Sequence, residues 1–491
     1  SYQGLREKHL KHHAFTEVIW MEVSLLDEVQ GADIGDKRLN RRLGRVVEEL
    51  GANPNLSIPA ATNARAEMEG AYRFFANDKV SPEKILGPHS EATRARISQN
   101  EIVLLVQDTT EFDLTRPQQQ VRGAGPMDCE ARRGAFWHPL QAYNIDGLPL
   151  GTVWQETWVR EKIETTLTRA EKNRERQHTP IEEKESIRWV EGIRAAREVA
   201  QTCPETVCVC VGDSEADIYE LFSEPRKTDA SEVQLLVRAC QSRSTTDQSN
   251  WFDEVRATAC LYRCTVDVSA RKAKIATKTS KREKSRKARV AEVEVRAATV
   301  TLKPPYRFDR KLPEVHINVV LVEEANPPDG CDAIQWLLVT TLPIDNSEQV
   351  KQIVQAYCIR WQIEIFFRTI KSGCRIEERQ FETLDRMLNC VSVYAIIAWR
   401  VMYLCRLGRT CPDLSCEVVF EPCEWKSVYM TIKRKAPPLT PPTLNEIVRM
   451  VASMGGYVIR KSTDPGTQTM WIGLQRLHDL STAWNAFGPD S

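Results

Sequence analysis

Two apolar runs that each end in an aspartate constrain the fold of this chain most. Residues 101–110 read EIVLLVQDTT and residues 207–222 read VCVCVGDSEADIYELF. Uninterrupted apolar residues without a helical period are typical of strands buried on both faces of a sheet. We therefore expect Asp108 and Asp213 to lie at the ends of two buried strands. Each aspartate could equally cap the turn or helix that follows it.

The elements around these runs predict a mixed α/β sheet. Residues 134–158 contain two β-rich runs joined at Asp146-Gly147, a strong hairpin signal. A charged helical stretch at about residues 161–201 separates this hairpin from the second apolar run. Another strand is expected at 233–240, VQLLVRAC. The order strand, hairpin, helix, strand, helix, strand is that of a mixed sheet.

Residues 357–373, YCIRWQIEIFFRTIKSG, predict a helix with two different faces. At about 100° per residue, the polar stripe spans an arc of roughly 60° and consists of Tyr357, Arg360, Glu364 and Lys371. The apolar stripe, at the spacing of a core-packing helix, consists of Ile359, Ile363, Phe366 and Ile370. Ser372 and Gly373 provide a stop. The polar stripe suits a phosphate-handling site, and the alternative is an ordinary ion pair between Arg360 and Glu364.

Composition narrows the class of protein. The 491 residues are enough for about three domains, and 67 basic residues balance 67 acidic ones. The basic residues are unevenly distributed, since ten of the nineteen residues in 271–289 are Lys or Arg. That density is typical of a phosphate-binding strip, although a solvated loop has the same composition. The sequence contains no GxxxxGK, HExxH, EF-hand loop or GxSxG motif.

The cysteines and the apolar segments favour a cytoplasmic protein outside the membrane. The fifteen cysteines include no CxxC pair, and the odd count without a signal peptide indicates reduced thiols. The longest apolar run, residues 387–399, has 13 residues. A helix needs roughly 18 to 20 to span a bilayer, so this run is expected to be a buried helix.

Two strand-end aspartates and the glutamate of the two-faced helix together predict a metal site. Carboxylate oxygens are the ligands that Mg²⁺ prefers, and few of them are needed. Two such ions, about 3.5 to 4 Å apart, serve in-line displacement at phosphorus. We therefore expect Asp108, Asp213 and Glu364 to converge.

This set of residues resembles the DDE triad of bacterial cut-and-paste transposases. Asp108, Asp213 and Glu364 occur in the family's order, with a β-rich insertion between the second and the third. The polar stripe resembles, with its spacing, the YREK signature of the insertion-sequence subgroup whose members form a DNA hairpin. EGAYRFF at 69–75 and WIGLQRLHDLSTAW at 471–484 extend the resemblance over most of the chain.

The resemblance implies a ribonuclease H-like mixed-sheet catalytic core, of class α/β, with a β-rich insertion and helical ends. The implied segments are a helical DNA end-binding domain (31–95), the core (96–245 and 346–408), the insertion (246–345) and a helical dimerisation region (409–491). Residues 1–30, with His9, His12 and His13, have no clear counterpart in the family and are expected to form a helical extension of unknown role. The prolines of 433–442 predict a surface linker, because they disrupt a continuing helix.

The resemblance also implies roles for individual residues. The triad would be catalytic and would hold two Mg²⁺ ions, for which Mn²⁺ could substitute. Tyr357, Arg360 and Lys371 would contact phosphates near the cut, and Trp336 would stack on a flipped base. Trp336 could instead be a core strand residue. Weaker matches to DNA-contacting arginines are Arg238, at the end of LLVRAC, and Arg42, on a helix expected at 35–51.

The implied function is DNA transposition. The enzyme would bind the terminal inverted repeats of a transposon, excise the element through a hairpin intermediate and join its 3′ ends to target DNA. Its partners would be double-stranded DNA and a second copy of the chain, in a bacterial cytoplasm at the nucleoid. Two alternatives are a ribonuclease H-like nuclease without strand transfer and a catalytically inert, transposase-derived repressor or inhibitor that binds DNA.

Overall fold

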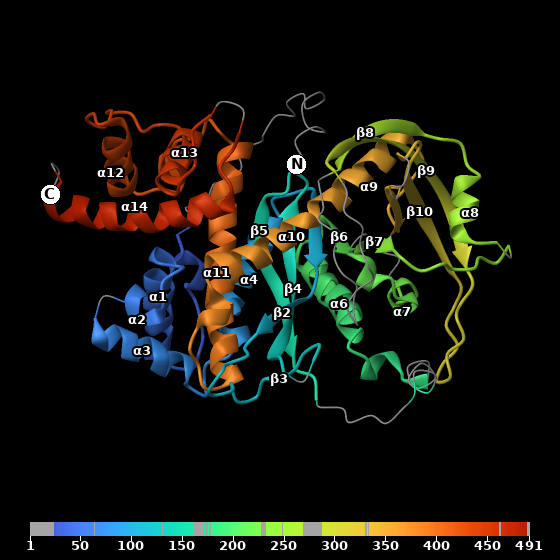
Figure 1. The fold of residues 1–491 in the computed structure, drawn as a ribbon, viewed down its shortest axis with the longest axis horizontal. Helices are drawn as coiled ribbons and strands as arrows, with labels where there is room; N and C mark the ends of the chain where they lie inside the picture. Colours follow the sequence, from blue (N-terminus) through green and yellow to red (C-terminus); the bar gives the residue numbers. More distant parts are fainter. Residues whose placement is uncertain are drawn as a thin grey trace. The chain divides into compact units, whose positions relative to one another are not determined.

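The computed structural model describes residues 24–488 apart from 63, 130, 162–167, 169–170, 172–174, 176–177, 227–231, 248, 269–286, 329–330, 332 and 461–462. The histidines of the predicted extension and most of the basic run at 271–289 lie outside the described residues. The chain forms two compact units, which we describe separately (Figure 1). One comprises Ile19–Lys162 and Trp361–Ser491, and the other contains Ile163–Arg360.

A five-stranded antiparallel arrangement lies at the centre of the first unit. Strand β4 (Arg133–Asn144) pairs with β1 (Ile102–Gln107), β2 (Thr110–Asp113), β3 (Gly125–Pro126) and β5 (Pro149–Trp158). The predicted hairpin is confirmed, and its turn contains Gly147 with φ of 75°, a backbone conformation that glycine adopts without strain. The predicted strand before Asp108 is also confirmed, with residues 103–107 buried.

Two long helices pack on β5 in the same unit, α4 (Pro82–Ile97) and α11 (Leu384–Thr410). The indole of Trp399 in α11 donates a hydrogen bond to the Pro149 carbonyl at 2.9 Å. By length and apolar composition α11 could cross a membrane, but 89% of its most apolar 18-residue window is buried inside the fold. The predicted buried helix is thus present and continues well past residue 399.

Helices form both ends of this unit. Near the N-terminus lie η1 (Asp27–Val29), α1 (Lys37–Ala52), α2 (Ile58–Ala61) and α3 (Arg65–Phe75). The predicted helix at 35–51 is confirmed as α1, in which Leu43, Val46 and Leu50 are buried. After α11 come η6 (Cys416–Val418), α12 (Pro422–Lys433), α13 (Leu444–Met454) and α14 (Thr467–Phe487). The proline-rich segment between α12 and α13 is mostly exposed, as predicted.

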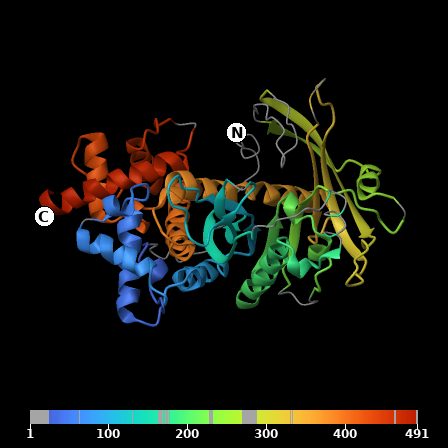
Figure 2. The same cartoon turned by 60° about the horizontal axis from the view of Figure 1, so that its bottom comes forward.

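The second unit contains a six-stranded sheet in the order β6, β7, β11, β10, β9, β8. Strands β6 (Val207–Gly212) and β7 (Gln234–Ala239) are parallel, and the pairs that follow are antiparallel, in β11 (Gln335–Thr340), β10 (Val315–Glu324), β9 (Arg289–Leu302) and β8 (Tyr262–Val268). Figure 2 shows β9 and β10 in yellow beside the green strands. The described strands within residues 246–345 are β8 to β11, and they continue the sheet of β6 and β7.

The helices of the second unit are η2 (Ile181–Glu183), α6 (Ile187–Thr202), η3 (Ser214–Ala216), α7 (Tyr219–Phe222), α8 (Trp251–Arg256) and α9 (Ser347–Ile359). The charged stretch expected to be helical at about 161–201 is described only in part, and its described helix is α6. Residues 187–202 form that helix because an apolar face can pack on β6, and Trp189, Ile193 and Val199 are buried there.

The segment predicted as one α-helix at 357–373 differs in detail. Helix α9 ends at Ile359, α10 covers Trp361–Arg368, and Thr369–Gly373 form a π-helical turn. Arg360 between them keeps right-handed helical angles, φ −47° and ψ −35°. The wider turn places Lys371 out of α-helical register, a distortion that is frequent at functional sites.

Candidate active site

Asp213 and Arg238 lie at the same edge of the second unit's sheet. Strands β6 and β7 are parallel, and Gly212 is in register with Val237. Asp213 follows Gly212 and Arg238 follows Val237. The two residues therefore lie side by side at the carboxyl ends of β6 and β7. Asp213 Oδ1 accepts a hydrogen bond from the Glu215 amide at 2.7 Å, so the predicted alternative role as a cap is real. A cap through one oxygen is compatible with ligation through the other.

Trp336 and Tyr357 contact each other close to this edge. Leu338 of β11 pairs with Arg238 of β7, and Trp336 lies two residues before Leu338, on the same face of the sheet. The ring centroids of Trp336 and Tyr357 are 6.4 Å apart with planes inclined by 54°. Trp336 is half-buried, so it is neither a core residue nor fully exposed.

The phenol of Tyr357 is close to three charged side chains at the carboxyl ends of β6 and β7. Burial raises the pKa of its phenol, the charges of Arg360 and Arg238 lower it, and the carboxylate of Asp213 raises it. The net direction is upward, so the phenol stays protonated and can donate a hydrogen bond. The Arg360 guanidinium carbon lies 6.0 Å from the Tyr357 ring centroid. The second unit thus brings together Asp213, Arg238, Trp336, Tyr357 and Arg360.

In the first unit, a buried hydrogen-bond chain holds the end of β1, where Asp108 begins the following turn. Asp108 Oδ1 accepts from the Thr109 amide at 2.7 Å. His138 Nε2 lies 3.0 Å from Gln107 Oε1, and its Nδ1 lies 2.8 Å from Thr109 Oγ1. Because an amide oxygen can only accept, Nε2 carries the proton and Nδ1 accepts from the Thr109 hydroxyl. The backbone on both sides of Asp108 is therefore fixed.

Glu364 lies on the exposed face of α10, away from the helix's buried face. Ile363 and Phe366 are buried, and the Phe366 ring lies 5.8 Å from that of Trp137 in β4. Trp137 pairs in register with Thr110, two residues after Asp108. Glu364 itself is exposed. The apolar stripe predicted from sequence therefore packs α10 against the strands that flank Asp108.

Lys371 lies over β2 in the same unit. Its ammonium is 5.9 Å from the Phe112 ring centroid and 3.8 Å from Glu377 Oε1. That same oxygen accepts a hydrogen bond from the Asp113 amide at 2.9 Å. The contact fixes the direction of a long, flexible side chain near the strand that follows Asp108.

Three family models match the chain in succession. A model for the transposase DNA-binding domain matches residues 21–80, one for the transposase DDE domain matches 171–398, and one for the Tn5 transposase dimerisation domain matches 396–483. The chain carries the three domains of a Tn5-type DDE transposase. The mixed α/β architecture also fits the ribonuclease H-like core that the sequence predicted.

A solved structure that resembles this transposase is described as a cryo-EM structure of the piggyBac transposase synaptic complex with hairpin DNA. The sequence identity is 8%, the TM-score is 0.34, and the match covers 86% of this chain and 80% of that one. Similarity at this level carries no argument about the fold or function.

The transposase family models do not cover all predicted site residues equally. The DDE match begins at residue 171, so it includes Asp213 and Glu364 but not Asp108. Arg42 lies within the DNA-binding match, on α1. Its guanidinium forms an ion pair with Glu67 of α3, and Arg45 lies 3.3 Å from the same carboxylate.

The predicted metal ligands of the transposase are divided between the two units. Asp108 and Glu364 belong to one, and Asp213 belongs to the other. Among the residues that the structure describes, no three His, Cys, Asp or Glu side chains form a group placed to hold a metal ion. The donor chemistry nevertheless fits a hard divalent cation, because all three side chains offer carboxylate oxygens. Glu364 is exposed, and Asp108 and Asp213 are partly buried.

Sequence reasoning missed the residues that support the site. Gln107 is a polar residue at the end of a buried strand, and this mismatch was a signal that a buried partner such as His138 must exist. Asp217, which is 1% exposed, also went unnoticed. No motif marks either His138 or Asp217.

Proposed function

We propose that this transposase is catalytically active and that Asp108, Asp213 and Glu364 bind the divalent ions of its active site. The proposal rests on one observation. The charged side chains of Asp213, Arg238 and Arg360 all lie near the phenol of Tyr357. A carboxylate beside two guanidiniums and a hydroxyl donor is suited to a phosphodiester next to a metal ion.

The side chains of this group would hold the DNA strand during reaction. Arg238 and Arg360 would donate to non-bridging phosphate oxygens, and Tyr357 would donate through its hydroxyl. Lys371 would contribute a point charge to a neighbouring phosphate. Trp336, half-buried with its ring against Tyr357, would stack on a base turned out of the duplex.

Bound Mg²⁺, or Mn²⁺ in its place, would lower the pKa of an attacking water or 3′-hydroxyl and stabilise the leaving oxygen. Two ions are proposed in each site. The three carboxylates would fix their positions, and Asp213 is held for this by the Glu215 amide. Asp108 is similarly oriented by the Thr109 amide.

The sequence of reactions is proposed to include a DNA hairpin. After a nick at the transposon end, the freed 3′-hydroxyl would attack the opposite strand, release the flanking DNA, and, after the hairpin reopens, attack target DNA. Residues 31–95 would bind the terminal repeat, with Arg42 contacting it, and residues 409–491 would join two copies in the synaptic complex. Residues 246–345 would form an insertion within the core. The enzyme would act in a bacterial cytoplasm.

The test is a cleavage assay with a duplex that carries the terminal repeat read from the DNA flanking the gene. Purified Asp213→Ala or Glu364→Ala protein should lose Mg²⁺-dependent cleavage by more than a hundredfold, yet bind the duplex normally. Asp385→Ala, which removes an acid from the start of α11, serves as the matched control. Unchanged cleavage by both site variants would refute the catalytic assignment.

The same assay separates the two alternatives by product. Hairpins and joined plasmids identify a transposase. Nicks without joined products identify a nuclease, and a shifted band without cleavage identifies an inert DNA-binding protein.

A further inference from the structure

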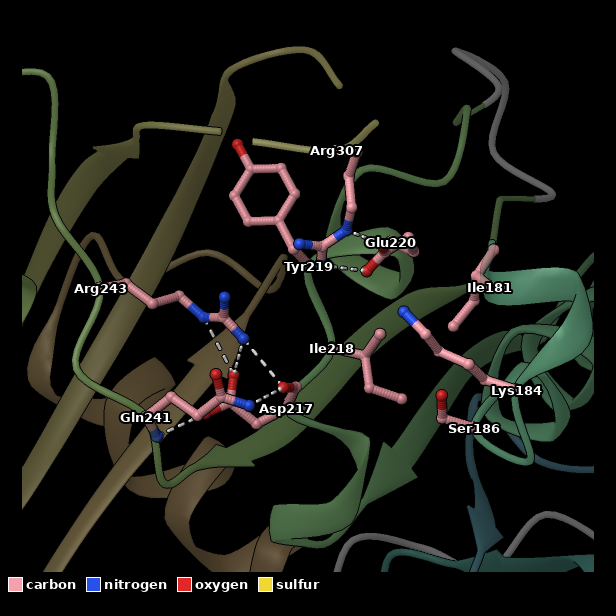
Figure 3. A pocket seen from close by; sticks show the side chains of 10 residues that line it. All are labelled: Ile181, Lys184, Ser186, Asp217, Ile218, Tyr219, Glu220, Gln241, Arg243 and Arg307. Atoms are coloured by element: carbon pink, nitrogen blue, oxygen red, sulfur yellow. Dashed lines mark hydrogen bonds and ion pairs between the residues drawn. The ribbon is translucent and has the colours of Figure 1, made fainter. Parts of the chain in front are cut away.

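A small cavity lies in the second unit, lined in part by residues that follow β6 and β7 in the chain (Figure 3). Its volume is about 130 Å³. The wall is built from η2 and the segment after it, the Asp217–Glu220 segment, the loop after β7 and the segment between β9 and β10. It includes three cations, Lys184, Arg243 and Arg307. A space of this volume can hold several waters and therefore has room for a small anion.

Both carboxylate oxygens of the buried Asp217 in this wall accept hydrogen bonds. Asp217 Oδ2 accepts from the amides of Cys240 and Gln241, both at 2.7 Å. Its Oδ1 accepts from Arg243 Nε at 3.0 Å. A carboxylate surrounded by N–H groups is a poor metal ligand. Asp217 therefore serves to orient Arg243 and to tie the loop after β7 to the loop after β6.

The second acid orients the second guanidinium. Glu220 accepts from Arg307 Nε at 2.6 Å and from Nη2 at 3.2 Å. Burial alone would raise the pKa of Glu220, but the hydrogen bonds and charge of Arg307, together with the charge of Lys184, lower it. Figure 3 shows the Lys184 ammonium on the side of the cavity facing these residues. With both acids ionised and paired, the wall keeps an excess of one positive charge.

Arg243 is also shielded from solvent, which strengthens its attraction for an anion. Its guanidinium carbon lies 5.3 Å from the Phe222 ring centroid, 5.7 Å from Trp251 and 5.8 Å from Tyr219. In Figure 3, the nitrogen that carries no drawn bond points away from Asp217. A preorganised donor in a partly desolvated place binds an anion more strongly than a surface arginine does.

Two residues that line the cavity lie only a few positions after Asp213 and Arg238 in the sequence. Asp217 follows Asp213 by four residues, and Gln241 follows Arg238 by three. Four residues span at most about 14 Å, which corresponds to roughly four nucleotides at 3.4 Å each. A strand whose scissile phosphate lies at Asp213 can therefore reach the cavity with a nearby phosphate.

We propose that this cavity binds a backbone phosphate of DNA through Lys184, Arg243 and Arg307, a few nucleotides from the scissile bond. The inference rests on the proposed function, because it takes DNA as the ligand. The contact would set the register of the strand without reading its sequence, as phosphate contacts do. A random-sequence duplex is therefore a sufficient probe.

The first experiment measures protection of Lys184 from an amine-reactive reagent by mass spectrometry, in the full chain without divalent ions. A random-sequence duplex should slow labelling of Lys184 at least fivefold and leave exposed Lys311 unchanged. Protection by inorganic phosphate but not by the duplex would assign the site to a free anion and overturn the proposal. So would equal labelling with and without the duplex.

The second experiment compares Arg307→Gln with Arg310→Gln. Both side chains pair with acids, but only Arg307 lines the cavity. The slope of log affinity against log salt should fall by about 0.9 for Arg307→Gln, as expected for one lost phosphate contact, and stay constant for Arg310→Gln. Equal slopes would overturn the proposal. Since neither experiment needs cleavage, an inactive enzyme with a protected Lys184 would contradict only the proposed catalysis.

Discussion

The rings of Trp336 and Tyr357 meet with centroids 6.4 Å apart, although 21 residues separate them in the chain. The contact joins β11 to α9. It therefore places a stacking surface beside the hydroxyl that we propose to bind phosphate. A base and its own phosphate could be held at the same time by these two neighbours.

Replacement of Trp336 should affect hairpin formation more than the first nick. Base stacking on an aromatic ring contributes about 1 to 3 kcal/mol, so Trp336→Ala should reduce the hairpin yield roughly fivefold to a hundredfold. Trp336→Phe keeps a ring and should restore most of the yield. Products from a labelled end duplex, resolved on a denaturing gel, give both quantities. Equal loss of nicks and hairpins would point to a structural role.

Removal of the Tyr357 hydroxyl should weaken the reaction without disturbing the fold. Tyr357→Phe keeps the contact with Trp336 but deletes one hydrogen bond to phosphate, worth about 1.5 kcal/mol or more when the acceptor is charged. The cleavage rate should fall about tenfold, with an unchanged melting temperature. Tyr429→Phe, at a partly buried tyrosine of α12, is the control. A rate equal to that of the natural enzyme would mean that the hydroxyl does not contact phosphate.

Much of this arrangement could be read from the sequence because it depends on local patterns. The strands before Asp108 and Asp213 follow from uninterrupted apolar runs, and α10 follows from Ile363, Phe366 and Ile370 at helical spacing. The π-helical turn at Lys371 could not be read, since five residues are too few to show a side-chain period of their own. The triad's geometry stays a prediction.

The supporting contacts were invisible for a different reason. His138 reaches Gln107 across paired strands, and Asp217 reaches Arg243 across two loops. Such pairs depend on the register of distant segments, which a single sequence does not encode in any short motif. A polar residue in an apolar run indicates that a buried hydrogen bond exists, but it does not identify the partner residue.

Chelation should abolish cleavage and leave DNA binding. The three proposed ligands are carboxylates, which have little affinity for DNA and repel its phosphates when no ion is bound. Dialysis against EDTA should remove activity, and Mg²⁺ or Mn²⁺ should restore it. A gel-shift assay in the same buffers provides the control. Cleavage at the full rate in excess chelator would exclude the proposed metal site.

A buried ion pair in the first unit should make stability depend on acid pH. Glu28 accepts from Arg96 Nη1 at 2.7 Å and Nη2 at 3.0 Å, and it also bonds His89 Nδ1. His89 Nε2 accepts from the Thr152 amide at 3.0 Å, so Nδ1 carries the proton of a neutral ring. Burial lowers the pKa of His89, in agreement. These bonds join η1 to α4 and β5.

The sign of the effect follows from the pKa of Glu28. Burial alone would raise it, but the hydrogen bonds from His89 and Arg96 and the charge of Arg96 prevail and hold the pKa of Glu28 below its ordinary value. A carboxyl whose pKa is lower in the folded state stabilises the fold above its unfolded pKa, and this stabilisation is lost as the pH falls through the folded pKa. The contribution is present above the unfolded pKa of about 4.5 and declines as the pH falls below that value.

Glu28→Gln should therefore lower the urea midpoint at pH 7, and the gap from the natural protein should narrow as the pH falls below 4.5. Glu91→Gln is the matched control, because Glu91 is exposed on α4, the helix that carries Arg96. Urea unfolding followed by tryptophan fluorescence between pH 7 and pH 3 measures the gap, since Trp399 lies 4.4 Å from the Arg96 guanidinium. A gap that stays constant over this range would show that Glu28 does not titrate with folding, and that its contribution comes from packing alone.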